Sequence, residues 1–140
     1  MNVAFFLTPK KDVIFLKYDV TMRQALEKME FHRYSAVPLV NDVGQYVGTI
    51  TEGDLLWKLK NTAGLTFANT EKIHINEIEQ RFHYNPVSIN AQMDDLITRA
   101  MNQNFVPVVD DQQIFIGIVR RSDIIEYCAG QLSLIKQTAL

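Results

Sequence analysis

The sequence predicts an α+β (α/β) fold in which two β-α-β-β-α repeats pack as one pseudo-two-fold domain. Three observations support this prediction. First, the segment GTITEGD at residues 48–54 recurs 69 residues later as GIVRRSD. Second, the segment AVPLVND recurs as FVPVVDD at the same offset. Third, each copy contains short apolar runs typical of strands and, elsewhere, apolar residues at the spacing of an amphipathic helix. A copy of about 50–55 residues buries too little surface to be stable by itself. We therefore expect the two copies to share one core.

The first repeat is expected at residues 8–62. It begins with a short strand at VIFL, residues 13–16, and continues with an amphipathic helix. That helix is predicted by apolar residues at helical spacing, namely Met22, Ala25, Leu26 and Met29. Two apolar strands follow, and the segment DVGQ between them, residues 42–45, is short enough for a hairpin, so these strands should pair antiparallel. A second helix completes the repeat.

The second repeat is expected at residues 81–130 and has the same order of elements. Its short strand is PVSI, residues 86–89, and its hairpin turn is DQQ, residues 111–113. Asp94 and Asp95 stand where its first helix opens, a position that favours acids without any catalysis. The helix matches that of the first repeat at an offset of 71, so the second repeat lacks two residues between helix and strand. The matching apolar positions are Met93, Leu96, Ile97 and Ala100.

Two segments lie outside the repeats. Residues 63–80 form a connector whose first part is rich in Gly, Thr and Asn and whose second part, at the start of IHINEIEQRF, predicts a short helix. Residues 131–140 form a tail with apolar side chains at Leu132, Leu134 and Ile135. The tail either extends the last helix or docks on a partner chain, and the sequence leaves both alternatives open.

Composition argues against several classes of function. The net charge is −2 and the basic residues are spread along the chain, so the electrostatic footprint of a nucleic-acid-binding protein is missing. Five consecutive apolar residues, Val3 to Leu7, are too few for a signal peptide or a membrane span. The single cysteine, Cys128, cannot form a disulfide within the chain, which indicates a reducing compartment. We expect a cytoplasmic protein that binds neither nucleic acid nor membrane.

The sequence contains no constellation of catalytic or metal-binding residues. His32, His74 and His83 are far apart and share no spacing typical of metal ligands. Cys128 lies in an apolar helix and is expected to be a packing residue and not a nucleophile. We therefore expect no enzyme activity, no metal site and no required cofactor.

Two segments, AVPLVND…YVGTITEGDLL and FVPVVDD…FIGIVRRSDII, resemble the two copies of a CBS-domain pair, or Bateman module. The resemblance covers residues 8–130. It implies a stand-alone regulatory module that forms flat homodimers and binds an adenosine-containing ligand, such as AMP, ADP, ATP, cyclic di-AMP or S-adenosylmethionine, in clefts between the two repeats. The nucleotide would act as a regulatory ligand, and the signal would pass to an effector protein that the sequence does not identify.

The resemblance also implies roles for particular residues. In the family, the Asp that opens the second helix of a repeat accepts hydrogen bonds from ribose hydroxyls, with help from the preceding Thr. These roles fall on Asp54 with Thr51 in the first repeat and on Asp123 in the second. The apolar strand residues that would enclose the adenine are Val37, Pro38, Val106 and Pro107.

The two Asp residues also have a purely structural interpretation. Thr51 and Asp54 have the spacing of a capping box at a helix start, where an acid also suits the helix dipole. In the second repeat Arg120 replaces the capping Thr, yet Asp123 remains, which a capping pair does not explain. A ribose diol is a suitable partner for charge-assisted hydrogen bonds to a carboxylate. Ligand binding is therefore favoured, and each Asp can serve both roles.

A phosphate group would need basic partners, and the sequence offers three. Arg120 and Arg121 stand next to the free N–H groups and positive dipole end of the final helix, and Arg33 lies near the first Val-Pro pair. The alternative is that these arginines are only solvated. Where relatives carry phosphate-binding basic residues before the Val-Pro pairs, this chain has Ser35-Ala36 and Asn104-Phe105. This departure supports the alternative of a ligand-free structural or interaction module that acts only through dimer or partner assembly.

Overall fold

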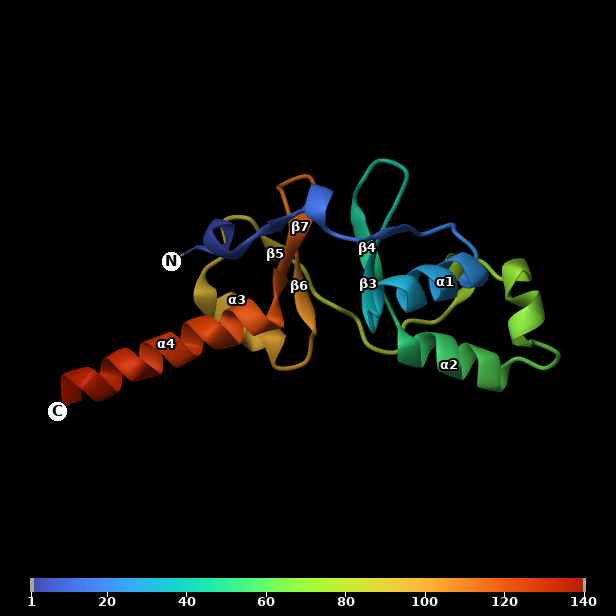
Figure 1. The fold of residues 1–140 in the computed structure, drawn as a ribbon. Helices are drawn as coiled ribbons and strands as arrows, with labels where there is room; N and C mark the ends of the chain where they lie inside the picture. The colour runs from blue at the N-terminus through green and yellow to red at the C-terminus, as the bar shows by residue number, and fades with distance from the viewer. Residues whose placement is uncertain (1, 140) are drawn as a thin grey trace.

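The computed structural model describes residues 2–139 and consists of two small sheets that stand side by side, each with two helices on its outer side (Figure 1). This arrangement confirms the predicted fold class. The first sheet has the order β2 (Leu16–Lys17), β3 (Ala36–Val40), β4 (Tyr46–Thr51), and carries α1 (Met22–His32) and α2 (Glu52–Asn61). The second sheet has the order β1 (Thr8–Pro9), β7 (Phe115–Arg120), β6 (Phe105–Val109), β5 (Val87–Ser88), and carries α3 (Met93–Ala100) and α4 (Arg121–Ala139).

The two sheets share the same strand register. β2 pairs with β3 in parallel through Leu16 and Leu39, and β5 pairs with β6 in parallel through Val87 and Val108. The hairpins β3–β4 and β6–β7 are antiparallel, as their short turns predict. The strand predicted at residues 13–16 is misplaced, because β2 begins only at Leu16 and ends at Lys17. The strand predicted at residues 86–89 is shorter in the structure, where β5 has two residues. The residues before them turn toward the space between the two sheets.

β1 crosses from the first repeat to the edge of the second sheet. Thr8 pairs with Ile118 and Pro9 pairs with Gly117. A Cβ at Gly117 would collide with the carbonyl oxygen of Thr8, and Gly117 has φ +153°, a conformation that side chains rarely adopt. Only glycine permits this close approach. In the first repeat, the side chain of Gln80 approaches Gly48 in the same way.

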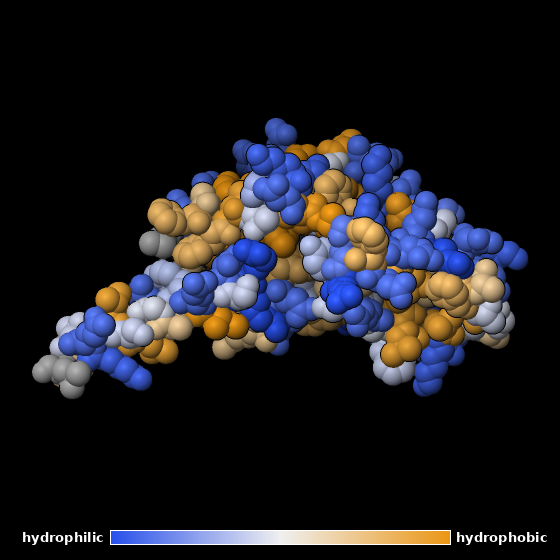
Figure 2. All heavy atoms as spheres, in the orientation of Figure 1, coloured by the Kyte–Doolittle hydropathy of each residue, from blue (hydrophilic) through white to orange (hydrophobic). Residues whose placement is uncertain are grey.

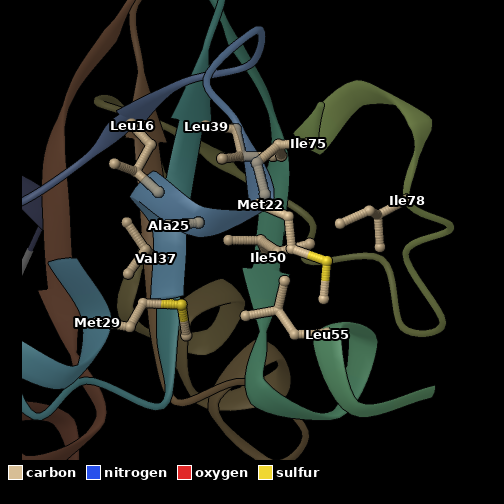
Figure 3. Close-up of a cluster of buried hydrophobic side chains, with 10 residues drawn as sticks. All are labelled: Leu16, Met22, Ala25, Met29, Val37, Leu39, Ile50, Leu55, Ile75 and Ile78. Atoms are coloured by element: carbon tan, nitrogen blue, oxygen red, sulfur yellow. The ribbon is translucent and has the colours of Figure 1, made fainter. Parts of the chain in front are cut away.

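Each repeat has its own hydrophobic core between its sheet and its helices. In the first repeat, buried side chains of α1 and α2 pack against those of β3 and β4 (Figure 3). The α1 side of this core consists of residues at the predicted helical spacing, Met22, Ala25 and Met29. A smaller third cluster, formed by Ala36, Tyr84 and Phe105, lies between the two sheets. This cluster joins the repeats into one domain.

The connector and the tail complete the chain. The connector holds two 3-10 turns, Phe67–Lys72 and Ile75–Glu77, and the second of these lies where a short helix was predicted. The tail continues α4 as a helix up to Ala139. Residues 129–139 are exposed because this part of the helix runs away from the body of the protein (Figure 1). Within residues 2–139, no helix is long and apolar enough to cross a membrane.

Candidate functional site

The two repeats meet along a pseudo-two-fold axis, where equivalent residues touch. Asn104 Nδ2 donates a hydrogen bond to Ser35 Oγ (3.2 Å), and these two residues are equivalent because they are 69 positions apart. At the hairpin tips, Gln45 and Ile114 have the same offset and form an isolated β-bridge. The pseudo-symmetry therefore relates two positions between the sheets, one associated with each repeat.

One of these places is a cavity of ≈ 290 Å³, called the open cleft below. Both repeats contribute to its walls, through Arg33, Pro38, Phe105, Ile118 and Arg120. The segment that follows β1 closes one side with Asp12, Val13 and Ile14. Figure 2 shows a hollow between the two halves of the molecule, with apolar surface at its base and polar surface on either side. The open cleft thus combines apolar walls with two guanidinium groups.

Arg120 stands between the open cleft and a neighbouring hollow that contains Asp123. Its Nε donates a hydrogen bond to Asp123 Oδ2 (3.2 Å), in an ion pair whose side chains are 61% and 26% exposed. Asp123 lines the neighbouring hollow of ≈ 470 Å³, while Thr8 and Arg120 line both spaces. The structure therefore brings Arg120 and Asp123 together, with the arginine in the wall of the open cleft.

The pseudo-equivalent place is filled by Tyr84, and we call it the closed cleft. Leu16 and Val87 hold the same register position and are 71 residues apart, so Tyr84 is the equivalent of Val13. The Tyr84 side chain is buried and packs on Phe105, with ring centroids 5.1 Å apart. A large aromatic residue thus occupies the position where the open cleft has a small aliphatic one.

Hydrogen bonds hold Tyr84 in the closed cleft. Its hydroxyl accepts a bond from the backbone N–H of Asn104 (3.1 Å), and its carbonyl oxygen accepts one from the hydroxyl of Tyr46 (3.0 Å). The Tyr46 hydroxyl also lies 2.7 Å from Thr49 Oγ1. Burial raises the pKa of Tyr46, so its phenol keeps the proton that it donates. These bonds make Tyr84 a fixed part of the joint between the repeats.

Asp54 attaches the residue that directly follows the connector, Arg81, to the first repeat. Its side chain is buried, and its two carboxylate oxygens accept hydrogen bonds from the backbone N–H groups of Thr51 and Arg81, each at 2.9 Å. Its own N–H donates to Thr51 Oγ1 at 3.2 Å, which completes a capping box at the start of α2. The structural interpretation of this pair is therefore present, together with a contact to Arg81 that sequence reasoning did not find.

The remaining predicted site residues lie apart from the open cleft. Arg121 is the first residue of α4, and its Nε donates to the carbonyl oxygen of Gln103 at 2.7 Å. Val37 and Val106 are fully buried in the separate cores of the two repeats. Pro107 is buried in β6. A role for these four residues in ligand binding stays a prediction, as do the exact bounds of the repeats.

Sequence reasoning also missed the segment between β1 and β2. Asp12, Val13 and Ile14 line the open cleft, although they precede the first repeated motif. The signal that indicates this segment is Gly117, a glycine within a strand. A glycine inside a strand marks a place where another part of the chain approaches closely. At Gly117 that part is β1, which leads directly into the lining of the open cleft.

The histidines make local contacts. The His32 ring stacks on Tyr34, with centroids 5.6 Å apart, and His74 Nδ1 lies 2.8 Å from the carbonyl oxygen of Asp19. In the part of the chain that the structure describes, no three His, Cys, Asp or Glu side chains gather in a group that could hold a metal ion.

Comparison with known sequences bears on the identity of these repeats. The family model described as the CBS domain matches the chain twice, over residues 6–61 and 77–130. A CBS domain-containing protein of Dictyostelium discoideum is 26% identical over 134 residues, which cover 90% of this chain and 91% of that protein. The family matches include the segments that line the open cleft.

Solved structures show the same fold. The crystal structure of CbpB in complex with c-di-AMP matches with a TM-score of 0.81 and 22% identity, over 99% of this chain and 91% of that chain. The structure of CBSX2 in complex with AMP matches with a TM-score of 0.72 and 21% identity, over 94% of this chain and 98% of that chain.

Proposed function

Because the chain belongs to the CBS-domain family, we propose that it is a regulatory module that binds an adenosine-containing nucleotide in the open cleft. The observation that carries this proposal is the cavity of ≈ 290 Å³ between the repeats, with Arg33 and Arg120 in its walls. Apolar walls with a few polar groups are typical of small-molecule sites. Proteins of this family are typically regulatory and non-catalytic, and the proposal includes no reaction.

Each part of a nucleotide has a chemical partner in the open cleft. Adenine would pack against the apolar walls, which include Pro38, Phe105 and Ile118. Phosphate would bind the guanidinium groups of Arg33 and Arg120, whose planar forks match phosphate oxygens with charge-assisted hydrogen bonds. The carboxylate of Asp12 is available to accept hydrogen bonds from ribose hydroxyls or from the adenine amino group.

The size of the open cleft favours a ligand with one adenosine. Its ≈ 290 Å³ lies just below the range of roughly 300–1,000 Å³ that is typical of small-molecule pockets. AMP, ADP, ATP and S-adenosylmethionine contain one adenosine each, whereas cyclic di-AMP contains two. We therefore rank these four ligands before cyclic di-AMP, whose second half would extend beyond the cleft.

Asp123 joins the site when a ligand replaces it as the partner of Arg120. The Arg120–Asp123 ion pair is solvent-exposed, and such pairs contribute only about 0–1 kcal/mol. A phosphate can therefore take over Arg120 with little loss of stability. The released carboxylate of Asp123 would then accept hydrogen bonds from the ribose, which is the role that the family resemblance assigns to it.

Two structural neighbours support the choice of ligand class. CbpB is described in complex with c-di-AMP and CBSX2 in complex with AMP, and the two ligands share an adenosine monophosphate unit.

We further propose that nucleotide occupancy of the open cleft is signalled to an effector protein. The single cysteine, Cys128, supports a place in a reducing compartment such as the cytoplasm.

A second function, a ligand-free interaction module, is favoured by the closed cleft. There Tyr84 occupies the space between the sheets, and both carboxylate oxygens of Asp54 are bonded to backbone N–H groups. If the open cleft also served only to join the repeats, the protein would act through assembly alone. The two functions differ in whether any nucleotide stabilises the fold.

Thermal unfolding with a ligand panel tests the proposal. The panel contains AMP, ADP, ATP, cyclic di-AMP and S-adenosylmethionine, with guanine nucleotides as controls. A ligand at about 100 times its Kd adds about 2.7 kcal/mol to the free energy of unfolding. For a chain of this length we expect the Tm to rise by several degrees with at least one mononucleotide of adenine.

Arginine variants locate the site. Arg33→Ala and Arg120→Ala should each weaken binding about tenfold or more, because a hydrogen bond to a charged group contributes about 1.5–3 kcal/mol. Arg81→Ala is the matched control, since the Arg81 side chain lines a different hollow beside Asp54. A panel without any Tm shift would reject the proposal in favour of the interaction module. If Arg81→Ala loses nucleotide binding while Arg33→Ala and Arg120→Ala retain it, the nucleotide site lies in the first repeat and not in the open cleft.

A further inference from the structure

The open cleft and the closed cleft share one wall. A cluster of buried side chains, Ala36, Tyr84 and Phe105, lies between the two sheets, and Ile118 packs against it. Ala36, Phe105 and Ile118 also line the open cleft. Tyr84 reaches the same wall from the closed cleft, which its buried side chain fills. The packing of Tyr84 therefore bears on the shape of the cavity on the other side of the wall.

Two contacts join Tyr84 to this wall. Its ring packs on the ring of Phe105, with centroids 5.1 Å apart and an angle of 50° between the rings. Its hydroxyl accepts a hydrogen bond from the backbone N–H of Asn104 at 3.1 Å. Phe105 and Asn104 are neighbours in the chain, and both line the open cleft. Because Tyr84 is only 6% exposed, its side chain has little freedom to move away from either residue.

Asn104 needs the bond to Tyr84 because it lies just outside the sheet. β6 begins at Phe105, so Asn104 is the last residue before the strand. Its carbonyl oxygen accepts a hydrogen bond from the backbone N–H of Arg121 (3.2 Å), and its side-chain amide donates to Ser35 across the pseudo-two-fold axis. The partner of its own N–H is the Tyr84 hydroxyl. Without that hydroxyl, one of the bonds that hold Asn104 at the edge of the open cleft is lost.

The chain around Tyr84 is fixed on both sides, so this residue can act as a support. On one side, the backbone N–H of Arg81 donates to the buried carboxylate of Asp54 at 2.9 Å. On the other side, the backbone N–H of Asn85 donates to Gln103 Oε1 at 2.9 Å, and Gln103 Nε2 donates back to the carbonyl oxygen of Asn85 at 3.2 Å. Gln103 is 2% exposed. Tyr84 therefore lies in a segment with little freedom to shift, and it holds the wall in one place.

We infer that Tyr84 is a positioning residue for the adenine end of the open cleft, an inference that rests on the proposed function. Its ring holds Phe105, the side chain against which adenine would pack, and its hydroxyl holds Asn104 at the edge of the same cavity. A wall that is ordered before binding reduces the ordering cost that a ligand has to meet. The closed cleft thus contributes to nucleotide binding without taking a ligand itself.

Isothermal titration calorimetry of a Tyr84→Phe variant, with AMP and adenosine as probes, tests this role. The variant keeps the ring and loses only the hydroxyl, so the Kd of AMP should rise about threefold to tenfold, as expected for one neutral hydrogen bond. The Kd of adenosine should rise by the same factor, because Tyr84 supports the adenine end. The ratio of the two Kd values should therefore keep its wild-type value in Tyr84→Phe. Arg120→Ala should instead bring this ratio closer to one, because a phosphate contact is lost.

Tyr46→Phe is the matched control. The Tyr46 hydroxyl donates to the carbonyl oxygen of the same residue, Tyr84, and its removal leaves the bond between Tyr84 and Asn104 in place. Thermal unfolding without nucleotide should show a lower Tm for both variants, whereas only Tyr84→Phe should weaken AMP binding. A loss of affinity that came from a looser fold alone would appear in both variants.

The outcomes separate this inference from the proposed function. If the wild type binds AMP and Tyr84→Phe binds it equally well, the inference is wrong while the nucleotide site stands. The same holds if Tyr46→Phe weakens AMP binding as much as Tyr84→Phe does, or if Tyr84→Phe raises the Kd of AMP and leaves that of adenosine unchanged. A wild type that binds neither probe would overturn the proposed function and this inference with it.

Discussion

The closed and the open cleft are built from the same repeat unit, yet different side chains occupy them. In the closed cleft, Tyr84 lies between the sheets, and both its hydroxyl and its carbonyl oxygen accept hydrogen bonds. In the open cleft, Val13 holds the equivalent position and borders a cavity of ≈ 290 Å³. One side is therefore a structural joint, while the other retains space for a small molecule.

The two repeated Asp residues, Asp54 and Asp123, also differ in how firmly the fold holds them. Asp54 is buried and binds two backbone N–H groups, one of them that of Arg81, which directly follows the connector. Asp123 is partly exposed, and its carboxylate accepts a hydrogen bond from the exposed side chain of Arg120. The comparison teaches that the two copies of a repeated motif can have different surroundings: the first Asp is fixed by backbone N–H groups within the fold, and the second is held by an exposed ion pair.

The largest expected effect is a difference in protein stability between variants of these two Asp residues. Asp54→Ala should lower the free energy of unfolding by about 2–4 kcal/mol. A buried N–H group left without a partner costs about 1–3 kcal/mol, and the two N–H groups that lose Asp54 are only partly buried, so the lower part of the summed range applies. Asp123→Ala should cost less than about 1 kcal/mol, because only an exposed ion pair is lost. Urea unfolding of both variants and of the wild type measures the difference.

A second outcome of the same experiment would change the comparison. If Asp54→Ala and Asp123→Ala destabilise the protein equally, the hydrogen bond between Asp54 and the backbone of Arg81 does not fasten the connector. If Asp54→Ala remains stable and loses nucleotide binding, Asp54 belongs to a ligand site, and the structural role assigned to it here is wrong.

The next effect concerns the residue that distinguishes the clefts. Val13→Tyr should fill the open cleft as Tyr84 fills the closed one, and should weaken nucleotide binding about tenfold or more, because added volume in a packed space forces side chains out of place. Val13→Ala is the matched control, since it enlarges the cleft and should retain binding. Isothermal titration calorimetry with the ligand found in the thermal screen compares the two variants. Full affinity in Val13→Tyr would place the ligand elsewhere.

Much of the fold was predictable because local patterns carry it. The repeat was visible in the matching segments, and the α1 positions Met22, Ala25 and Met29 follow helical spacing into the core. The short turns between the hairpin strands predicted antiparallel pairing, which the structure confirms. The Thr51–Asp54 capping box was also visible, because its hydrogen bonds join residues three positions apart.

The site was less predictable because distant segments build it. The contact between Asp54 and Arg81 spans 27 positions, and no local pattern indicates it. β3 and β6 are apolar and buried along their whole length, so alternation could not tell that Val37 faces a helix-covered core while Pro38 lines the cleft. The difference between Val13 and Tyr84 became informative only when the strand register showed that they are equivalent.

The number of nucleotides bound per chain tests the central claim most directly. Isothermal titration calorimetry of the wild-type protein, with the adenine nucleotide that gives the largest Tm shift, measures this stoichiometry. If only the open cleft binds, one nucleotide should bind per chain, and Arg120→Ala should abolish or strongly weaken that single event. Two nucleotides per chain would contradict the account, because the closed cleft would then have to release Tyr84 and accept a ligand.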